Sequence, residues 1–333
     1  MSAPARTGGV VEVEPDAWDA LLEELGVGDV YLRRDYVELS CFVDRGRPAF
    51  LTAGGVVFAA IVREVGRGIR DVTTPYGYGG PAGPGDGDAF YAAYESWCAA
   101  NRVVTTFIRF HPLLRNVALA PAQVVRHRLA NTATWPLEAG VDLLAGMHQM
   151  HRRGVRKAIR EGVEASIEPA PERMDDFAAL YEDTMRRRAA EDYYFFPPGY
   201  WDALAGPLRR RVVRLDARRN GEVVASQLHL AAAPWLHYHL GGATDEGFRL
   251  GASKLLFHAA AEWGRANGYA ELHLGSGLGG REDSLWEFKQ RFSPHPGHEF
   301  WVGKLVHDAG AYRALGGDPG DLGGFFPAYR AGS

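Results

Sequence analysis

A single lysine stands among aromatic residues near the end of the chain, in the segment "DSLWEFKQRF" (283–292). Lys289 follows Phe288 and comes three residues before Phe292, and a glycine-rich stretch, "GSGLGG", precedes the segment. An ammonium group that aromatic walls hold away from water can stabilise negative charge as it develops in a transition state. The alternative is an exposed lysine on a helix that buries its aromatic side, which is common in proteins.

A second group of cations lies in a predicted basic helix over 143–163. Its members are Arg152, Arg153, Arg156, Lys157 and Arg160. Three of the arginines recur every four residues and therefore share one helix face. The buried side of this helix is expected to consist of Val155, Ile159 and Val163. Aligned guanidinium groups favour a bound polyanion, whereas a solvated helix face is the alternative.

The composition limits the class of protein. The 333 residues are 46% hydrophobic and 23% charged, which predicts a globular chain long enough for two domains. The net charge of −4 argues against a protein that binds nucleic acid over its whole surface. No apolar run reaches the roughly 18 residues of a membrane span, and the N-terminus does not have the pattern of a secretion signal. Two cysteines suit neither a disulfide framework nor a metal site, so we expect a cytoplasmic protein without metal.

The elements that must position these residues occur twice in the same order: helix, strand, strand, helix, strand. In the first half they are expected over 17–25, 47–55, 56–65, 88–101 and 103–110. In the second half they are expected over 174–190, 221–232, 234–242, 251–268 and 269–276. Periodic apolar residues indicate the helices, and runs of β-branched and aromatic residues indicate the strands. One supersecondary unit is therefore used twice.

This repeat resembles the Fem family (FemABX-like) of non-ribosomal peptidyl transferases, whose domains belong to the GNAT acyltransferase superfamily. The segments that carry the resemblance, in chain order, are "TPYGYGGP" (74–81), "RFHPLLRN" (109–116), "HRRGVRKAIREGV" (151–163), "TMRRRAAEDYYFF" (184–196), "HYHLGGA" (237–243), "LGASKLLFHAAAEWGRANGYAELHLGSGLGG" (250–280) and "DSLWEFKQRFS" (283–293). The resemblance implies an α/β fold of two tandem GNAT-like domains, with mixed, mostly antiparallel sheets and a cleft between the domains. We expect the domains over 1–145 and 146–333, with the basic connecting helix at 146–163.

The resemblance also implies an activity, which is transfer of an amino acid from aminoacyl-tRNA to an amine with formation of an amide bond. The acceptor would be a soluble peptide, a peptidoglycan precursor or a natural product, including nucleotide-linked forms. Aminoacyl-tRNA would be the co-substrate, no further cofactor is expected, and the chain is expected to be a monomer.

Two other functions compete with this interpretation. An acyl-CoA-dependent GNAT N-acyltransferase, using acetyl-CoA or another acyl-CoA, binds pyrophosphate on a [RQ]-x-x-G-x-[GA] turn at a helix N-terminus. The corresponding stretch, "GFRLGAS" (247–253), has Phe248 and Ser253 at the first and last positions of the motif, which argues against such a site. A non-catalytic protein that only binds tRNA or a nucleotide-linked ligand is the third possibility, and the intact F-K-x-x-F segment argues against it.

The resemblance assigns roles to individual residues. Lys289 and Phe288 would be catalytic, and the five cations of the basic helix would contact tRNA. Substrate contacts would come from Arg34, Tyr76, Tyr78, Arg109, His111, Arg187, Arg188, Tyr194 and Tyr238. The register leaves Arg33 as an alternative to Arg34, and either tyrosine of the pair at 193–194 fits. His237 and His239 form an i, i+2 pair without a third ligand, so a core or groove role is expected in place of a metal site.

Overall fold

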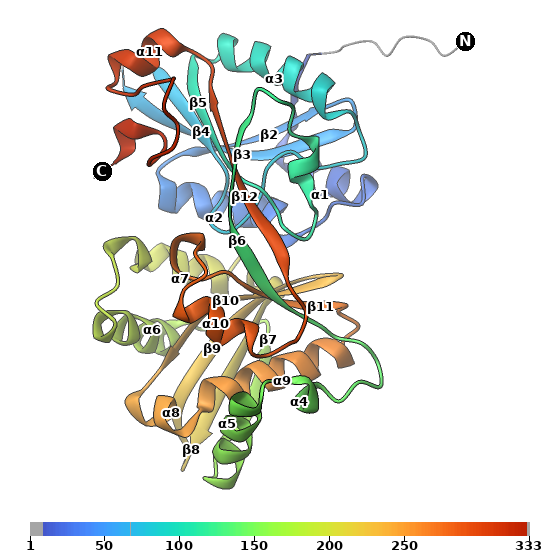
Figure 1. Ribbon diagram of the computed structural model, residues 1–333, viewed down its shortest axis with the longest axis vertical. Helices are drawn as coiled ribbons and strands as arrows, with labels where there is room; N and C mark the ends of the chain where they lie inside the picture. Colours follow the sequence, from blue (N-terminus) through green and yellow to red (C-terminus); the bar gives the residue numbers. More distant parts are fainter. Residues whose placement is uncertain (1–8, 67, 332–333) are drawn as a thin grey trace. The chain divides into compact units, whose positions relative to one another are not determined.

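The computed structural model describes residues 9–66 and 68–331. The chain divides into two compact units, one comprising Met1–Leu129 with Glu299–Ser333 and the other Ala130–His298 (Figure 1). Each unit has its own set of paired strands and its own hydrophobic core.

The first unit has the strand order β1-β2-β3-β4-β5-β12. These strands are β1 (Val11–Glu12), β2 (Arg47–Ala53), β3 (Val56–Gly66), β4 (Ile69–Thr73), β5 (Val103–Arg109) and β12 (His298–Val306). Its helices are α1 (Pro15–Glu24), α2 (Arg34–Asp44), α3 (Gly87–Ala100) and α11 (Ala309–Ala314). Gly54 and Gly55 both have positive φ, which lets β2 turn directly into β3. The pair β4–β5 is parallel.

The second unit has the strand order β6-β11-β10-β9-β8-β7. These strands are β6 (Val125–Pro136), β7 (Glu164–Pro169), β8 (Val212–Arg219), β9 (Glu222–Ala232), β10 (Trp235–Ala243) and β11 (Glu271–Gly275). Its helices are α4 (Leu143–Gly146), α5 (Gln149–Arg160), α6 (Asp175–Arg187), α7 (Pro198–Ala205), α8 (Asp245–Leu250), α9 (Ala252–Ala266) and α10 (Ser284–Gln290). Here the pair β10–β11 is parallel, and the other pairs are antiparallel.

The expected α/β class with mixed, mostly antiparallel sheets is confirmed. The limits of the units differ from the expected domains, because β12 pairs with β5 from Val302 to Val306 and brings the C-terminal segment into the first unit. Hydrophobic periodicity identifies a strand but does not record the strand with which it pairs.

The basic segment also differs from the expected single helix. It forms α4 and α5, separated at Met147 and His148, with Asp142 capping the first helix and the His148 side chain capping the second. Val155 is buried as expected, but Ile159 is 57% exposed, and Ala158 takes its place on the buried face. Val163 is also buried as predicted, so the prediction was wrong at one of its three positions.

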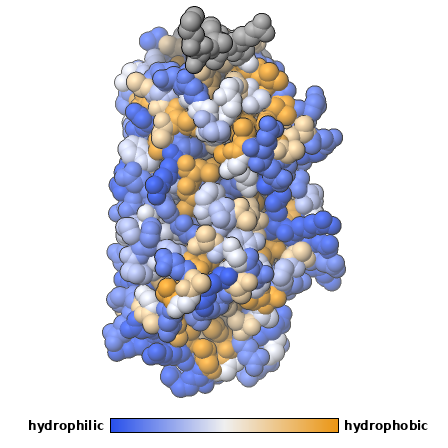
Figure 2. All heavy atoms as spheres, turned by 90° about the vertical axis from the view of Figure 1, so that its right-hand side faces the viewer, coloured by the Kyte–Doolittle hydropathy of each residue, from blue (hydrophilic) through white to orange (hydrophobic). Residues whose placement is uncertain are grey.

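Helix α9 carries the main apolar face of the second unit. Leu256, Phe257 and Ala260 are buried in its core, together with Trp135 of β6 and Leu272 of β11. Within the described residues, no helix is both long and apolar enough to cross a membrane. On the face drawn in Figure 2, hydrophobic residues lie in small groups among hydrophilic ones.

Candidate functional site

The site is built where the parallel strands of the second unit stop pairing. Strands β10 and β11 pair from Trp235–Glu271 to His237–His273, and β10 then has an irregularity between Tyr238 and Leu240. The Tyr238 ring packs against Phe257 of α9, with 4.8 Å between ring centroids. Tyr238 therefore stands on the helix-covered face, at the point where the two strands part.

Lys289 of α10 also reaches this point. It is only 7% exposed, and its Nζ donates a hydrogen bond to the carbonyl oxygen of Ser276 at 2.7 Å. The same Nζ lies 5.4 Å from the centre of the Tyr238 ring. An ammonium group has three N–H donors, and Ser276 is the one hydrogen-bond acceptor recorded for it among the described residues. Lys289 is thus a buried ammonium group whose other N–H donors have no acceptor among the described residues.

Burial lowers the pKa of Lys289 to about 8, although the nearby carboxylate of Asp283 acts in the opposite direction. Desolvation disfavours the charged form of an amine, whereas an opposite charge favours it. The group therefore titrates close to neutrality, where small changes in its surroundings alter its charge.

Asp283 shapes the turn beneath the lysine. Its carboxylate accepts hydrogen bonds from the backbone N–H groups of Leu278, Leu285 and Trp286, and so caps α10. Burial acts to raise the pKa of Asp283, but these N–H donors outweigh it and hold the pKa below its ordinary value. A Cβ at Gly277 would lie 2.0 Å from the Asp283 carboxylate, so the glycine-rich stretch leaves room for this cap.

Phe288 lies beneath the site and supports it. Its ring packs at 5.3 Å from Phe292 and at 4.9 Å from His151 of α5. His151 Nε2 also hydrogen-bonds the Phe288 carbonyl at 2.8 Å. Burial lowers the pKa of His151 to about 4, so this histidine is neutral at pH 7. The sequence patterns assigned no role to His151, although its position directly before the arginine run was an available signal.

Residues from the α6 region reach the same turn. Burial raises the pKa of Tyr194, and the nearby backbone of Gly279 acts in the opposite direction. Arg187 is held by Asp183 at 3.0 Å and by Asp245 at 2.8 Å. Arg188 lies over the exposed Phe248 ring at 5.0 Å and forms no ion pair with any residue that the structure describes. Of the two predicted arginines, Arg188 is the one whose charge is not already paired.

The five cations of the basic segment divide into two groups. Arg152 donates to the carbonyl oxygens of Ala145 and Met147 at 2.7 Å each, and Lys157 donates to that of Arg249 at 2.8 Å. The other three cations are exposed and have no ion-pair partner within residues 9–66 and 68–331. They are Arg153, Arg156 and Arg160.

Of the predicted contacts in the first unit, Arg34 and His111 have well-defined partners. Arg34 binds Glu38 at 2.8 Å and also Asp16, whereas the neighbouring Arg33 is buried. The fully buried His111 places Nε2 3.0 Å from the Asp29 carboxylate.

The remaining predicted residues of this unit lie around the "TPYGYGGP" loop. Tyr78 is buried, and its ring packs 5.8 Å from that of His111. The carbonyl oxygen of Tyr76 accepts a hydrogen bond from the Tyr36 hydroxyl at 2.8 Å. Arg109 donates to the carbonyl oxygen of Thr74 at 3.2 Å. The structure thus brings Tyr78 and His111 into contact.

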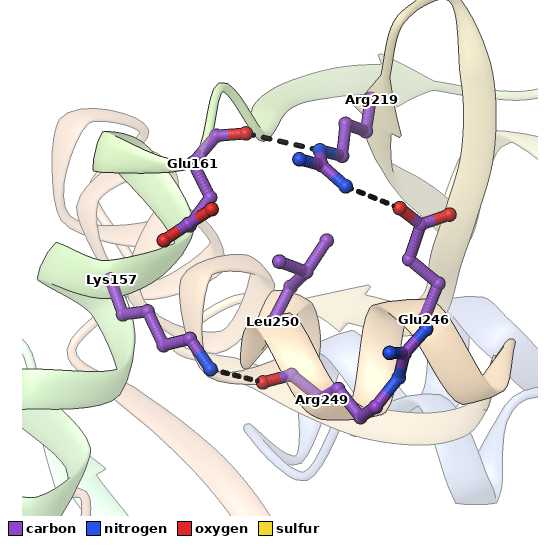
Figure 3. A pocket seen from close by; sticks show the side chains of 6 residues that line it. All are labelled: Lys157, Glu161, Arg219, Glu246, Arg249 and Leu250. Carbon is purple, nitrogen blue, oxygen red and sulfur yellow. Dashed lines mark hydrogen bonds and ion pairs between the residues drawn. The ribbon is translucent and has the colours of Figure 1, made fainter.

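A cavity of about 410 Å³ opens beside α5 and α8 (Figure 3). Its lining residues are Lys157, Glu161, Arg219, Glu246, Arg249 and Leu250. Arg219 donates to the Glu161 carbonyl at 3.1 Å and pairs with Glu246. The lining therefore carries charges of both signs that largely neutralise one another.

Comparisons with known proteins agree with this geometry. Residues 145–290 match the model of the acetyltransferase (GNAT) domain family. The structure is similar to FemX, with a TM-score of 0.67 and 13% identity over 92% of this chain and 99% of that chain. It is also similar to a conserved protein of unknown function from Bacteroides thetaiotaomicron, with a TM-score of 0.63 and 13% identity over 89% and 99% of the two chains.

A third similar structure is the C-terminal domain of an Agrobacterium fabrum protein named as a lysylphosphatidylglycerol synthetase. Its TM-score is 0.58, with 16% identity over 91% of this chain and 95% of that chain. No curated protein matches the chain. The resemblance inferred from the sequence is confirmed at the level of the fold: residues 145–290 match the acetyltransferase (GNAT) domain model, and the chain has the fold of FemX.

Proposed function

We propose that the protein is an aminoacyltransferase that moves an amino acid from aminoacyl-tRNA to the amine of an acceptor. The observation that carries this proposal is the buried ammonium group of Lys289, which lies where β10 and β11 part, in a chain with the fold of FemX. The coarser conclusion, acyl transfer, is supported by the family match itself.

The reaction needs positioning and charge stabilisation more than an enzyme nucleophile. The acceptor amine attacks the ester carbonyl, so that a C–N bond forms and the ester C–O bond breaks. The amine proton leaves with the ribose hydroxyl that is released. A remaining N–H of Lys289 can donate to the carbonyl oxygen as it becomes negative, while the hydrogen bond to Ser276 fixes the ammonium group.

The acceptor is proposed to lie near Arg188 and Tyr194. Arg188 presents an unpaired guanidinium group, which suits a phosphate or carboxylate on the acceptor. Tyr194 lies at the Gly279 turn that precedes α10. A small peptide, a peptidoglycan precursor or another nucleotide-linked amine would offer such an anionic group.

An acyl-CoA-dependent N-acyltransferase is the second candidate, because the matching family model describes acetyltransferases. The turn at 247–253 is evidence against an acyl-CoA site, because Phe248 and Ser253 replace the expected motif residues. Phe248 is also 66% exposed, so an apolar side chain occupies a position where a pyrophosphate site would need a polar one.

The deciding experiment compares two donors with the same enzyme and the same amine acceptors. Total charged tRNA and acetyl-CoA are supplied separately, and the acceptor mass is measured. We expect the mass of one amino-acid residue to be gained from charged tRNA, and RNase treatment to abolish the gain. A gain of an acetyl group from acetyl-CoA, insensitive to RNase, would instead establish the second candidate.

A further inference from the structure

Two polar side chains interrupt the apolar face that β9 presents to α9. Alternate residues of a strand share one face, and on this face Ala225 is buried in the core and Ala231 packs against it. Gln227 and His229 lie between them and are only 3% and 0% exposed. The His229 ring packs 6.3 Å from that of Phe257 of α9. A polar pair buried in this way needs hydrogen-bond partners for its polar atoms.

The hydrogen bonds of Gln227 fix the tautomer of His229. The amide nitrogen of Gln227 donates to the carbonyl oxygen of Ser253 at 3.2 Å, and its amide oxygen lies 3.2 Å from His229 Nε2. Because a carbonyl oxygen only accepts, the Gln227 oxygen must face the histidine, and Nε2 must carry the proton. Burial, with smaller contributions from His239 and His237, lowers the pKa of His229 to about 3, so the ring is neutral at pH 7. Nδ1 therefore presents a lone pair.

This lone pair is the unsatisfied group of the pair. His229 Nδ1 is buried and has no hydrogen-bond partner among the described residues. A ring nitrogen without a proton can only accept, so its partner must be an N–H or O–H group. An acceptor that is buried and left unpaired lowers stability. The arrangement therefore indicates that a ligand supplies the donor.

His229 and Lys289 lie around the same aromatic ring. Tyr238 stands opposite His229 in the register of β9 and β10, with 5.7 Å between the ring centroids. Lys289 Nζ lies 5.4 Å from the centre of the Tyr238 ring. One tyrosine thus neighbours a hydrogen-bond donor, the ammonium group, and an acceptor, His229 Nδ1. Gly241 leaves space beside this tyrosine, because a Cβ there would lie 2.7 Å from the Tyr238 hydroxyl oxygen.

We propose that His229 Nδ1 accepts a hydrogen bond from the α-amino group of the transferred aminoacyl residue, and so selects aminoacyl donors over plain acyl donors. The inference rests on the proposed function and adds the feature of the donor that is recognised. An aminoacyl group carries its amine on the carbon next to the carbonyl, so it offers an acceptor to Lys289 and a donor to His229 at once. An acetyl group offers only the acceptor. The Tyr238 ring turns aside to admit the amine, for which Gly241 leaves room.

The test measures binding of matched probes to the full chain. The first pair consists of the glycyl and acetyl amides of 3′-amino-3′-deoxyadenosine, which are stable mimics of a charged tRNA terminus and differ only in the α-amine. The same two acyl groups on amino-coenzyme A, in which an amine replaces the thiol, form the second pair. We expect the wild type to bind the glycyl amide of the adenosine at least about tenfold more tightly than the acetyl amide.

Two substitutions of His229 separate recognition from packing. Asparagine places its amide near the position of Nδ1, whereas glutamine places its amide near that of Nε2. His229→Asn should therefore keep most of the preference for the glycyl probe, and His229→Gln should abolish it. His258→Gln is the control, because His258 is a partly exposed histidine of α9 that pairs with Glu262 at 3.6 Å. It should leave the preference unchanged, and thermal unfolding of all three variants checks that they fold.

A structural role for His229 gives a different pattern. If this histidine only packs the core, both substitutions lower the melting temperature but leave the ratio of the two affinities unchanged, and the inference is wrong. Equal binding of the glycyl and acetyl amides by the wild type, or binding of neither pair, also overturns it. A preference for the glycyl group on amino-coenzyme A alone, lost in His229→Gln, would leave the role of His229 standing and show that the proposed tRNA donor is wrong.

Discussion

Each unit contains a parallel strand pair, and the two pairs differ in what lies beyond the point where pairing ends. In the first unit, β4 and β5 pair as far as Thr73 and Phe107, and the following loop continues the contact through a bridge from Gly79 to Phe110. Asn116 fixes this loop by donating to the carbonyl oxygens of Gly79 and Pro81 at 2.8 and 3.0 Å. In the second unit, pairing ends at His237 and His273, and a buried ammonium group lies beyond it.

Each unit also contains a buried lysine, and the two ammonium groups differ in their hydrogen bonds. Lys304 donates to the carbonyl oxygens of Leu322 and Gly324 and lies 5.8 Å from the Phe326 ring, so it ties down the C-terminal segment. Lys289 has a single recorded acceptor within the described residues. The comparison shows that, within the described residues, Lys304 has two carbonyl acceptors and Lys289 has one, so Lys289 retains more N–H groups without an acceptor.

The largest expected effect separates the two lysines. Lys289→Met should lower turnover at saturating acceptor about a hundred- to thousand-fold, equivalent to about 2.7–4 kcal/mol, because it removes one donor to the developing oxyanion. Acceptor affinity and folding should change little. Lys304→Met is the control, and it should lower the melting temperature with little loss of turnover. Steady-state kinetics, acceptor binding and thermal unfolding on both variants provide the measurements.

Other outcomes for Lys289→Met would contradict the difference proposed between Lys289 and Lys304. Normal turnover in a stable Lys289→Met enzyme would make this lysine a structural group like Lys304. Loss of acceptor binding in place of turnover would move Lys289 from the reacting carbonyl to an anionic group of the acceptor.

The next effect is a pH dependence that belongs to Lys289. Since its pKa in the folded protein is about 8, turnover that needs the ammonium form should fall as pH rises through about 8. The pH profile of turnover should therefore have an alkaline limb near 8, and Lys289→Met should lack it. A wild-type profile that keeps rising above pH 8 would contradict a role for the charged form and favour the neutral amine as a proton acceptor.

The lowered pKa of Lys289 also predicts how the stability of the protein depends on pH. The folded pKa lies below the ordinary lysine value of 10.5, so between about pH 8 and 10.5 the unfolded chain binds more protons at this position. The free energy of unfolding should rise with pH in that window, by up to about 3 kcal/mol relative to Lys289→Met. Denaturant unfolding of both proteins across this range checks the sign, and equal slopes would contradict it.

A third effect tests the closed loop of the first unit. Asn116→Ala removes the hydrogen bonds to Gly79 and Pro81, together with the one accepted from the His111 backbone at 2.7 Å. Leaving these buried groups unpaired should cost about 2 kcal/mol of unfolding free energy. Urea unfolding measures the loss. If acceptor affinity falls as well, the loop with Tyr76 and Tyr78 contributes to binding and is more than a support.

The smallest effect concerns the exposed arginines of α5. Replacing Arg153, Arg156 and Arg160 together by glutamine should weaken tRNA binding and lower its salt slope by about 2 to 3, since each phosphate contact contributes about 0.7–0.9. Arg173→Gln with Arg210→Gln is a control on exposed cations elsewhere in the same unit. An unchanged slope would mean that α5 presents only a solvated face.

Local features of this protein could be read from its sequence. The hairpin at Gly54 and Gly55, the periodic helix over 251–268 and the aromatic residues around Lys289 all depend on neighbours in the chain. The repeated supersecondary pattern, together with the resemblance to the Fem family, predicted the fold class. The roles assigned to the individual site residues stay predictions.

The tertiary structure alone decided which groups meet. Pairing of β12 with β5, the half-buried position of Lys254 beside Gly154 and the contact of His151 with Phe288 all join segments far apart in the chain. Periodicity reports which face of an element is apolar, but not which element will cover that face or which polar groups the packing will enclose. For that reason the sequence by itself determined the aromatic setting of Lys289, whereas the packing of α5, α9 and α10 decided its burial.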